Sequence, residues 1–249
     1  PASSGILASK ISVPNVFSLV ALYGLVLLIG LLLFLRKTSL PKREKKKTSE
    51  TLQWNSNLLK AYGGAFFLMF SQGVLAYLLP IYVQDLGYGS RVAGTLLSVF
   101  GIVAVLIFIL PTNKIFDYLN AQYTLLIGVL LMGIAQIGIG LASEMTLLYG
   151  ILALYGVGFA FLFPSINALL IEATTQEIRG KAYGYFYAFF SIGVVAGSSV
   201  LGALNLVGTP GFMFTGGILF TFCLVIIISL IKSNSSLLKV SRKENLHQS

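Results

Sequence analysis

Residues 155–204 read YGVGFAFLFPSINALLIEATTQEIRGKAYGYFYAFFSIGVVAGSSVLGAL and decide the fold. Two apolar segments flank a short polar loop, and Pro164 interrupts the first of them. The charged residues of the loop are Glu172, Glu177, Arg179 and Lys181. Two apolar helices joined by a charged hairpin are difficult to place in a soluble domain. They fit a lipid bilayer, because each is long enough to cross its hydrocarbon core.

The composition of the whole chain also indicates a membrane protein. Of the 249 residues, 56% are hydrophobic and 10% are charged, whereas soluble domains are about 25% charged. The net charge of +9 would suit a nucleic-acid partner, but the basic residues lie between long apolar runs and form no patterned face. We therefore expect the lipid bilayer, and no nucleic acid, as the macromolecular partner.

The sequence offers little for metal, redox or covalent chemistry. The single cysteine, Cys223, lies in an apolar run, and the single histidine, His247, lies in the polar tail. We find no paired carboxylates, no nucleophile with a base and no metal-ligand spacing. The sequence therefore predicts neither an enzyme nor a bound cofactor or metal.

The apolar runs predict an all-α integral membrane fold. About 20 apolar residues cross the hydrocarbon core as a helix, and a turn-forming stretch at residues 205–211 divides the longest run in two. The seven predicted spans are residues 13–35, 58–83, 93–111, 123–141, 146–171, 183–204 and 212–231. Residues 36–57 are then a basic linker, and residues 232–249 a tail.

The distribution of Lys and Arg orients the spans, since cytoplasmic loops carry an excess of both. If residues 36–57 are cytoplasmic, alternation of the spans puts all of the 17 Lys and Arg residues on that side except Lys10 and Arg91. We therefore expect a multi-pass protein of the cell membrane, with the linker and the carboxyl terminus in the cytoplasm.

An internal repeat relates the two ends of the chain. PASSGILA (residues 1–8) aligns with AGSSVLGA (residues 196–203), and each copy leads through a short loop to an apolar helix with a basic end. The repeat predicts that the first span closes an earlier six-helix unit and that residues 58–231 are a second copy. The chain, which starts at Pro1, is then expected to be a piece of a longer protein.

With this layout the chain resembles the carboxy-terminal half of a major facilitator superfamily transporter. Six spans follow a long linker, and the loop EIRGKAYG (residues 177–184) is similar to the family's RGxAxG pattern. The resemblance implies a six-helix half-bundle of a twelve-helix transporter, whose halves rock about a central solute site. Residues 1–35 would be the end of the fifth and the whole sixth helix of the first half.

A second family pattern, G-x-x-x-D-x-x-G-R-R, is largely lost in NKIFDYLNAQ (residues 113–122). Asp117 is kept, whereas Asn113 and Asn120 replace the glycines, and Ala121 and Gln122 replace the basic pair. We expect this departure to weaken the gating function of the loop and to leave the fold unchanged.

The interiors of the apolar runs contain no Asp, Glu, Lys, Arg or His. Charges inside a membrane usually mark proton relays and sites for charged substrates. We therefore expect no direct binding of phosphate, carboxylate or a coupling proton in this half. If transport is coupled to protons, the titrating acid is expected in the missing half.

Two glutamines are the polar residues of greatest interest in the apolar runs. Gln72 shares one helix face with Ala65, Met69 and Ala76, and its amide needs a partner from another helix, water or the solute. The resemblance makes this the seventh helix, which lines the cavity, so both interpretations stay open. Gln136 lies in what would be the peripheral ninth helix and is expected to be structural.

The stretch 155–204 holds the remaining candidates for the solute path. Phe163 and Asn167 share a face of one helix, and Tyr183 and Tyr187, with Ser191 beside them, form a stripe on the next. Such a stripe either packs or contacts a flat, lipophilic solute.

Proline and glycine in the same stretch affect the helices themselves. Pro164 donates no backbone hydrogen bond, so it is either a static kink or a hinge. Gly193 and Gly197 form a GxxxG motif, which is expected to allow close packing of two helices.

Charged residues in two cytoplasmic loops form a candidate inner gate. They are Asp117, Glu172, Glu177 and Arg179. Exposed ion pairs contribute only about 0–1 kcal/mol each, yet a network that breaks on opening can bias two states that differ by a few kcal/mol. The alternative is that these are solvated loop charges.

These observations predict secondary active transport of a small solute by alternating access. The resemblance and the aromatic, uncharged surface favour efflux of an amphiphilic or lipophilic compound. Uptake of a neutral polar solute such as a sugar stays open, and so does a non-transporting membrane scaffold or partner subunit.

Overall fold

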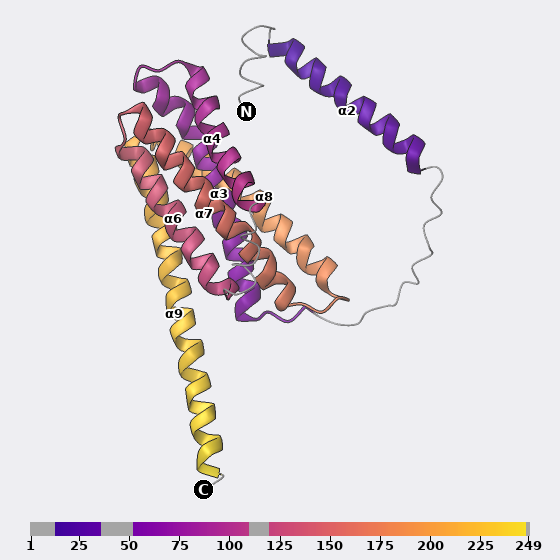
Figure 1. Ribbon diagram of the computed structural model, residues 1–249, viewed down its shortest axis with the longest axis vertical. Coiled ribbons are helices and arrows are strands. Elements are labelled where there is room, and N and C mark those ends of the chain that lie inside the picture. Colours follow the sequence, from indigo (N-terminus) through magenta and orange to yellow (C-terminus); the bar gives the residue numbers. More distant parts are fainter. Residues whose placement is uncertain (1–12, 36–51, 110–119, 248–249) are drawn as a thin grey trace. The chain divides into compact units, whose positions relative to one another are not determined.

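The computed structural model describes residues 13–35, 52–109 and 120–247, and every regular element in these ranges is an α-helix. The chain divides into two units, Pro1–Ser49 and Glu50–Ser249. The first unit contains α2 (Val13–Leu35). The helices of the second unit are α3 (Ser56–Asp85), α4 (Ser90–Ile109), α6 (Ala121–Leu141), α7 (Met145–Glu172), α8 (Arg179–Ala203) and α9 (Thr209–His247), as Figure 1 shows. The predicted all-α class is confirmed.

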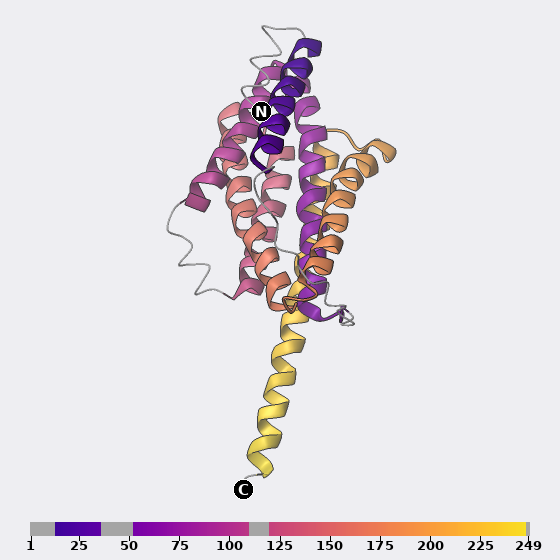
Figure 2. The ribbon, with the colours of Figure 1, turned by 90° about the vertical axis from the view of Figure 1, so that its right-hand side faces the viewer.

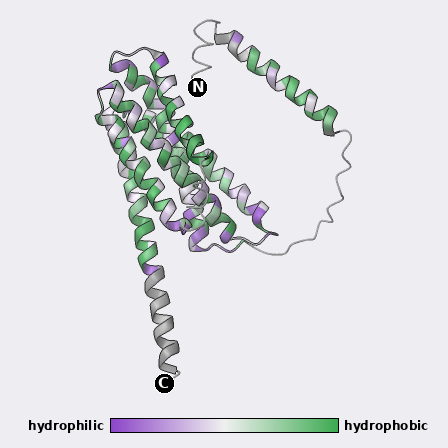
Figure 3. Ribbon diagram, viewed as in Figure 1, coloured by the Kyte–Doolittle hydropathy of each residue, from purple (hydrophilic) through white to green (hydrophobic). Residues whose placement is uncertain are grey.

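Six helices, all in the second unit, are long and apolar enough to cross a bilayer. Figure 3 shows apolar residues along most of their length and hydrophilic residues concentrated near their ends. In α2 the residues whose side chains are described form an apolar stretch over Ser18–Phe34. The sequence of α2 is apolar on every side of the helix, which is typical of a membrane span.

The predicted spans match the helices in number and order, and the differences lie at the ends. α3 begins before residue 58 because Asn55 caps it: the Asn55 Oδ1 accepts a hydrogen bond from the Leu58 N–H at 2.8 Å. α8 begins at Arg179 rather than at residue 183, because the Arg, Lys and Ala of this polar stretch are good helix formers. Asn205 and Gly208 have positive φ angles of 51° and 65° and make the predicted turn before α9.

The last helix extends further than predicted. α9 continues to His247, past the expected end at residue 231 (Figures 1 and 2). The stretch after residue 231 contains neither Pro nor Gly, and its Leu, Lys, Arg and Glu residues favour a helix. The tail at residues 232–249 is therefore helical as far as His247.

α7 continues through Pro164 as one helix. Two polar side chains bond to carbonyl groups beside the proline, since the Ser165 Oγ donates to Phe161 O at 2.6 Å and the Asn167 Nδ2 donates to Phe163 O at 2.9 Å. These bonds supplement the backbone ladder around the proline, whose missing N–H leaves the Ala160 carbonyl without its usual donor. Pro164 therefore does not end the helix, and its role as a kink or a hinge stays a prediction.

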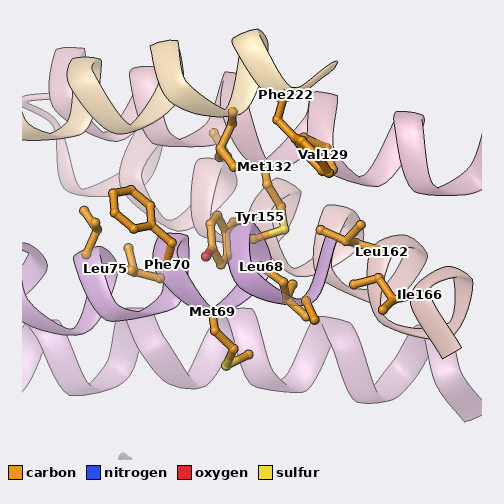
Figure 4. Packing of buried hydrophobic residues seen from close by; sticks show 14 of the residues in the cluster. Leu68, Met69, Phe70, Leu75, Val129, Met132, Tyr155, Leu162, Ile166 and Phe222 are labelled. Carbon is orange, nitrogen blue, oxygen red and sulfur yellow. The ribbon is translucent and has the colours of Figure 1, made fainter. Parts of the chain in front are cut away.

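The second unit packs around α3 and α6. α3 lies mainly against α8 and α7, α6 lies between α7 and α9, and α4 packs on α7. Figure 4 shows the Tyr155 ring in the middle of the buried apolar cluster, with Phe70 and Met132 among the residues around it. α4 and α8 are the least buried helices of the unit, so each keeps a face that no other helix of this unit covers.

Glycines set the distance between α3 and α8. A Cβ on Gly193 or Gly197 would overlap the carbonyl oxygen of Phe66 or Phe70, and a Cβ on Gly73 would overlap that of Val194. Small residues allow such close approach of membrane helices. The predicted packing role of Gly193 and Gly197 is confirmed.

Several predictions concern residues outside the described ranges. These are the repeat copy in residues 1–8, the linker residues 36–51, and Asn113 and Asp117 of the worn loop pattern. They stay predictions.

Candidate functional site

Gln72 lies on the side of α3 between α7 and α8. Successive residues of a helix are about 100° apart. Ser71 faces α7, because its Oγ lies 2.9 Å from the Tyr155 hydroxyl, and Gly73 faces α8 at Val194. Gln72 is half-buried, and its amide forms no hydrogen bond with any residue that the structure describes. This arrangement favours the interpretation of Gln72 as a lining residue.

Gln136 is the glutamine that joins helices. Its side chain is fully buried, and its Nε2 donates to the Ser71 Oγ at 2.7 Å and to the Ser71 carbonyl at 3.1 Å. Since Ser71 also bonds to Tyr155, the three residues connect α6, α3 and α7. The Gln136 Oε1 is buried without a hydrogen-bond partner. The structural role predicted for Gln136 agrees with these contacts.

α7 and α8 meet at a pair of polar side chains. The Tyr183 hydroxyl donates to the Asn167 Oδ1 at 3.3 Å, and Asn167 in turn bonds to the Phe163 carbonyl. The Tyr183 and Tyr187 rings lie 6.3 Å apart between centroids. The structure therefore brings the side chains of Asn167 and Tyr183 together, with the Tyr187 ring next to that of Tyr183. Phe163 takes part through its backbone carbonyl.

The other predicted residues lie apart from this contact. Ser191 is exposed and Gln72 is half-buried. Among the described residues, no hydrogen bond joins either of them to the α7–α8 contact. Tyr187 is 60% exposed, so most of its ring faces outward from the six helices.

Three of the candidate gate residues lie at what we call the basal end, where α3, α6 and α8 begin and α7 ends. The Arg179 Nη2 donates to the Thr174 carbonyl at 3.4 Å, and the Arg179 Nε is buried without a hydrogen-bond partner. Glu172 and Glu177 are exposed, and neither forms an ion pair with a described residue. The predicted pairing across the loops stays a prediction, because Asp117 lies outside the described ranges.

The structure reveals one basal residue that sequence reasoning does not single out, Lys60 of α3. Its side chain is only 7% exposed. The Lys60 Nζ donates to the Gln122 Oε1 at 2.9 Å, and the Gln122 Nε2 donates to the Asn57 Oδ1 at 2.9 Å. In the sequence, Lys60 lies just inside the predicted span 58–83. A lysine near the end of a membrane helix is common, because its long side chain reaches the polar surface, so the sequence alone does not mark Lys60 as unusual.

The residues before Lys60 contact the other helices of the basal end. The Trp54 ring lies 6.0 Å from the ring of Tyr185 in α8. The Asn55 Nδ2 donates to the carbonyl of Ala173, just after α7, at 3.3 Å. The Ser56 Oγ lies 3.2 Å from the Ser229 Oγ of α9. The start of α3 therefore contacts α6, α7, α8 and α9.

Comparison with known proteins adds a second kind of evidence. Residues 61–247 match the profile of the Major Facilitator Superfamily. The chain is 26% identical over 164 residues to Multidrug resistance protein 2 of Bacillus subtilis (strain 168), which covers 66% of this chain and 38% of that protein. It is 23% identical over 186 residues to Quinolone resistance protein NorA of Staphylococcus aureus (strain N315), which covers 73% of this chain and 48% of that protein. The chain thus spans less than half the length of these relatives.

Proposed function

Because the chain belongs to the major facilitator superfamily, we propose that it is the carboxy-terminal half of a secondary transporter that exports amphiphilic or lipophilic compounds by alternating access. The family consists of membrane transporters, so the chain is a multi-pass membrane protein of a transport family and not an enzyme. The names of the two relatives refer to multidrug and quinolone resistance. These names support export of drug-like compounds.

The α7–α8 contact is the observation that carries this proposal. Tyr183 and Tyr187 supply aromatic faces beside the Asn167 amide. Aromatic faces bind flat apolar molecules and also attract lipophilic cations. We propose that the solute path in this half consists of Gln72, Phe163, Asn167, Tyr183, Tyr187 and Ser191.

The chemistry of this surface supports a lipophilic solute over a sugar. None of the six residues carries a charge, so they offer no ion pair to a carboxylate or phosphate group. A sugar requires many hydrogen-bond partners, and the Asn167 amide and the Tyr183 hydroxyl already bond to each other or to the backbone. The half-buried Gln72 amide forms no hydrogen bond with a described residue, so it is a polar group that could orient a solute.

The membrane location and orientation form part of the same proposal. The basal end carries Lys60, Arg179 and Lys181, and basic residues accumulate on the cytoplasmic side of membrane proteins. We therefore propose the cell membrane as the location, with the basal end in the cytoplasm. Any coupling proton would be carried by acidic groups in the other half.

The proposal is tested with the full-length protein that contains this chain. Cells that express it are loaded with ethidium, and efflux of the dye is followed by fluorescence, while uptake of radiolabelled glucose is measured in parallel. Tyr187→Ala should reduce ethidium efflux several-fold, whereas Tyr187→Phe keeps the ring and the activity. Tyr123→Ala removes a tyrosine of α6 that is 47% exposed and is the matched control.

The outcomes separate the candidate functions. Ethidium efflux that depends on Tyr187 and not on Tyr123 supports export through the proposed path. Glucose uptake without ethidium efflux would support the sugar alternative. Movement of neither compound by the wild-type protein, when it is present in the membrane, would favour the scaffold or partner-subunit alternative.

A further inference from the structure

We propose that Lys60 supplies from α3 a positive charge beside position 122, where the family pattern has a basic residue and this chain has Gln122, and that it positions the start of α3 on α6. The effect on transport expected here rests on the proposed function. The effect on local structure does not, and the experiment below measures both.

The Lys60 ammonium group determines how the neighbouring amides are arranged. An ammonium group only donates hydrogen bonds, so the oxygen of the Gln122 amide faces it, at 2.9 Å from Nζ. The nitrogen of that amide then faces Asn57, whose Oδ1 accepts at 2.9 Å. Hydrogen bonds from a charged donor are stronger than neutral ones and polarise the next bond in a chain. One charge therefore orders contacts between the first turns of α3 and α6.

The Lys60 charge lies close to a position at which the family pattern has a basic residue and this chain does not. In residues 113–122 the second position of the basic pair is occupied by Gln122. The ammonium group of Lys60 lies one hydrogen bond away from that side chain, although the two residues are 62 positions apart in the chain. A cation is thus present beside the position where the pattern has one, but it belongs to α3 instead of α6.

Stability alone does not account for a lysine at this point. Lysine is almost never fully buried unless it is paired, and no carboxylate of a described residue pairs with Lys60. The start of α6, capped by Asn120, also carries the positive end of the helix dipole, which disfavours a nearby cation. A buried charge without an opposite charge beside it carries a desolvation cost. We therefore assign the charge to the arrangement of the basal end rather than to global stability.

The start of α3 contacts every other helix named at the basal end, so a local change in its structure affects all of these contacts. Trp54, Asn55 and Ser56 contact α8, the end of α7, and α9. Lys60 and Asn57 add the contact with α6. If the bond to Gln122 is lost, the first turn of α3 loses its hydrogen bonds to α6, and its other contacts loosen with it.

The test uses a single-cysteine reporter in the full-length protein. Cys223→Ala removes the one cysteine of this chain, and any cysteines elsewhere in the full-length protein are replaced likewise. Leu58→Cys then places a thiol at a fully buried position in the first turn of α3. Labelling by a membrane-impermeant maleimide is measured in inside-out vesicles. Leu59→Cys, at a position that is 55% exposed, is the matched control and should label equally in every variant.

Three changes are compared on this background. Lys60→Gln removes the charge, Lys60→Arg keeps it, and the double change Lys60→Gln with Gln122→Lys moves it to α6. We expect Lys60→Gln to raise labelling of the Leu58→Cys thiol several-fold and to lower the maximal rate of ethidium efflux about tenfold with an unchanged KM, as for loss of one charge-assisted hydrogen bond. Lys60→Arg and the double change should restore both values, while the melting temperature stays the same throughout.

Each outcome has a defined meaning. Equal labelling in the parent and in Lys60→Gln would overturn the proposal, and so would a double change that labels as strongly as Lys60→Gln. A lower melting temperature in Lys60→Gln that the double change does not restore would reduce Lys60 to an ordinary packing residue and also overturn it. If the parent exports no ethidium, the proposed function fails, and the labelling series still decides the role of Lys60.

Discussion

Gly197 of α8 packs against the Phe70 carbonyl of α3 so closely that a Cβ at position 197 would overlap the carbonyl oxygen. The same relationship holds one turn earlier between Gly193 and Phe66. Contacts of this kind bring Cα–H groups to carbonyl oxygens, which stabilises packed membrane helices. The position of α8, which carries Tyr183 and Tyr187, therefore depends on glycine at two positions.

Gly197→Ala should destabilise the protein because α8 must move away from α3. Overpacking of this kind costs roughly 1–3 kcal/mol. The measurement is the melting temperature of the detergent-solubilised protein. Gly217→Ala in α9 is the matched control, since no atom lies within 4 Å of a Cβ at that position, and it should be neutral or stabilising by about 0.5–1 kcal/mol. Equal melting temperatures for the two variants would contradict the close α3–α8 packing.

Helix number and close packing could be predicted from the sequence because both depend on local patterns. Long apolar runs give the number and order of the helices, and the spacing of Gly193 and Gly197 indicates a contact surface. The length of α9 could not be predicted in this way. Its stretch after residue 231 is polar, and hydropathy, which identifies spans, does not distinguish a polar helix from a polar tail.

The two membrane glutamines should respond differently to the same change. Gln136→Leu removes two hydrogen bonds to Ser71 and should lower the stability by about 0.6–1.7 kcal/mol, since such bonds between membrane helices contribute about 0.6 kcal/mol on average and about 1.7 at most. Gln72→Leu removes no hydrogen bond to a described residue and should leave the melting temperature unchanged while it alters solute transport. A stability loss for Gln72→Leu equal to that for Gln136→Leu would show that Gln72 also joins helices.

The sequence could not separate these glutamines, because both lie in apolar runs of similar character. The difference arises from angular position on two helices. Gln136 faces Ser71, which is 65 residues away in the chain, whereas Gln72 lies between the directions of α7 and α8. Lys60 was missed for a similar reason, since its partner Gln122 is distant in sequence. Contacts between distant residues require the packing of the helices to be known.

Arg179→Ala should impair transport without loss of the protein from the membrane. The Arg179 guanidinium group links the first turn of α8 to the Thr174 carbonyl, and its buried Nε has no hydrogen-bond partner. Ethidium efflux and the amount of protein in the membrane are measured together. Lys181→Ala removes an exposed basic residue nearby and should behave as the wild type. Wild-type efflux by Arg179→Ala would remove the gate role of this arginine.

Asn167 and Tyr183 should act as one unit in solute binding. Asn167→Ala and Tyr183→Phe each break the bond between the Tyr183 hydroxyl and the Asn167 Oδ1, so each should raise the KM for ethidium. Residues that share a bond give non-additive effects, and the double variant should be little worse than either single one. Tyr185→Phe, which removes a hydroxyl on another side of α8, is the control. Additive effects in the double variant would show that the two residues act separately.

Solute protection of position 72 tests the central claim most directly. In the full-length protein with Cys223→Ala and any other cysteines replaced, the thiol of Gln72→Cys is labelled with a maleimide in the presence and absence of excess ethidium, and Leu59→Cys serves as the reference. We predict that ethidium slows labelling at position 72 and leaves position 59 unaffected, because we propose that Gln72 lines the solute path. Equal labelling rates at position 72 with and without ethidium, in a protein that still exports the dye, would contradict this account.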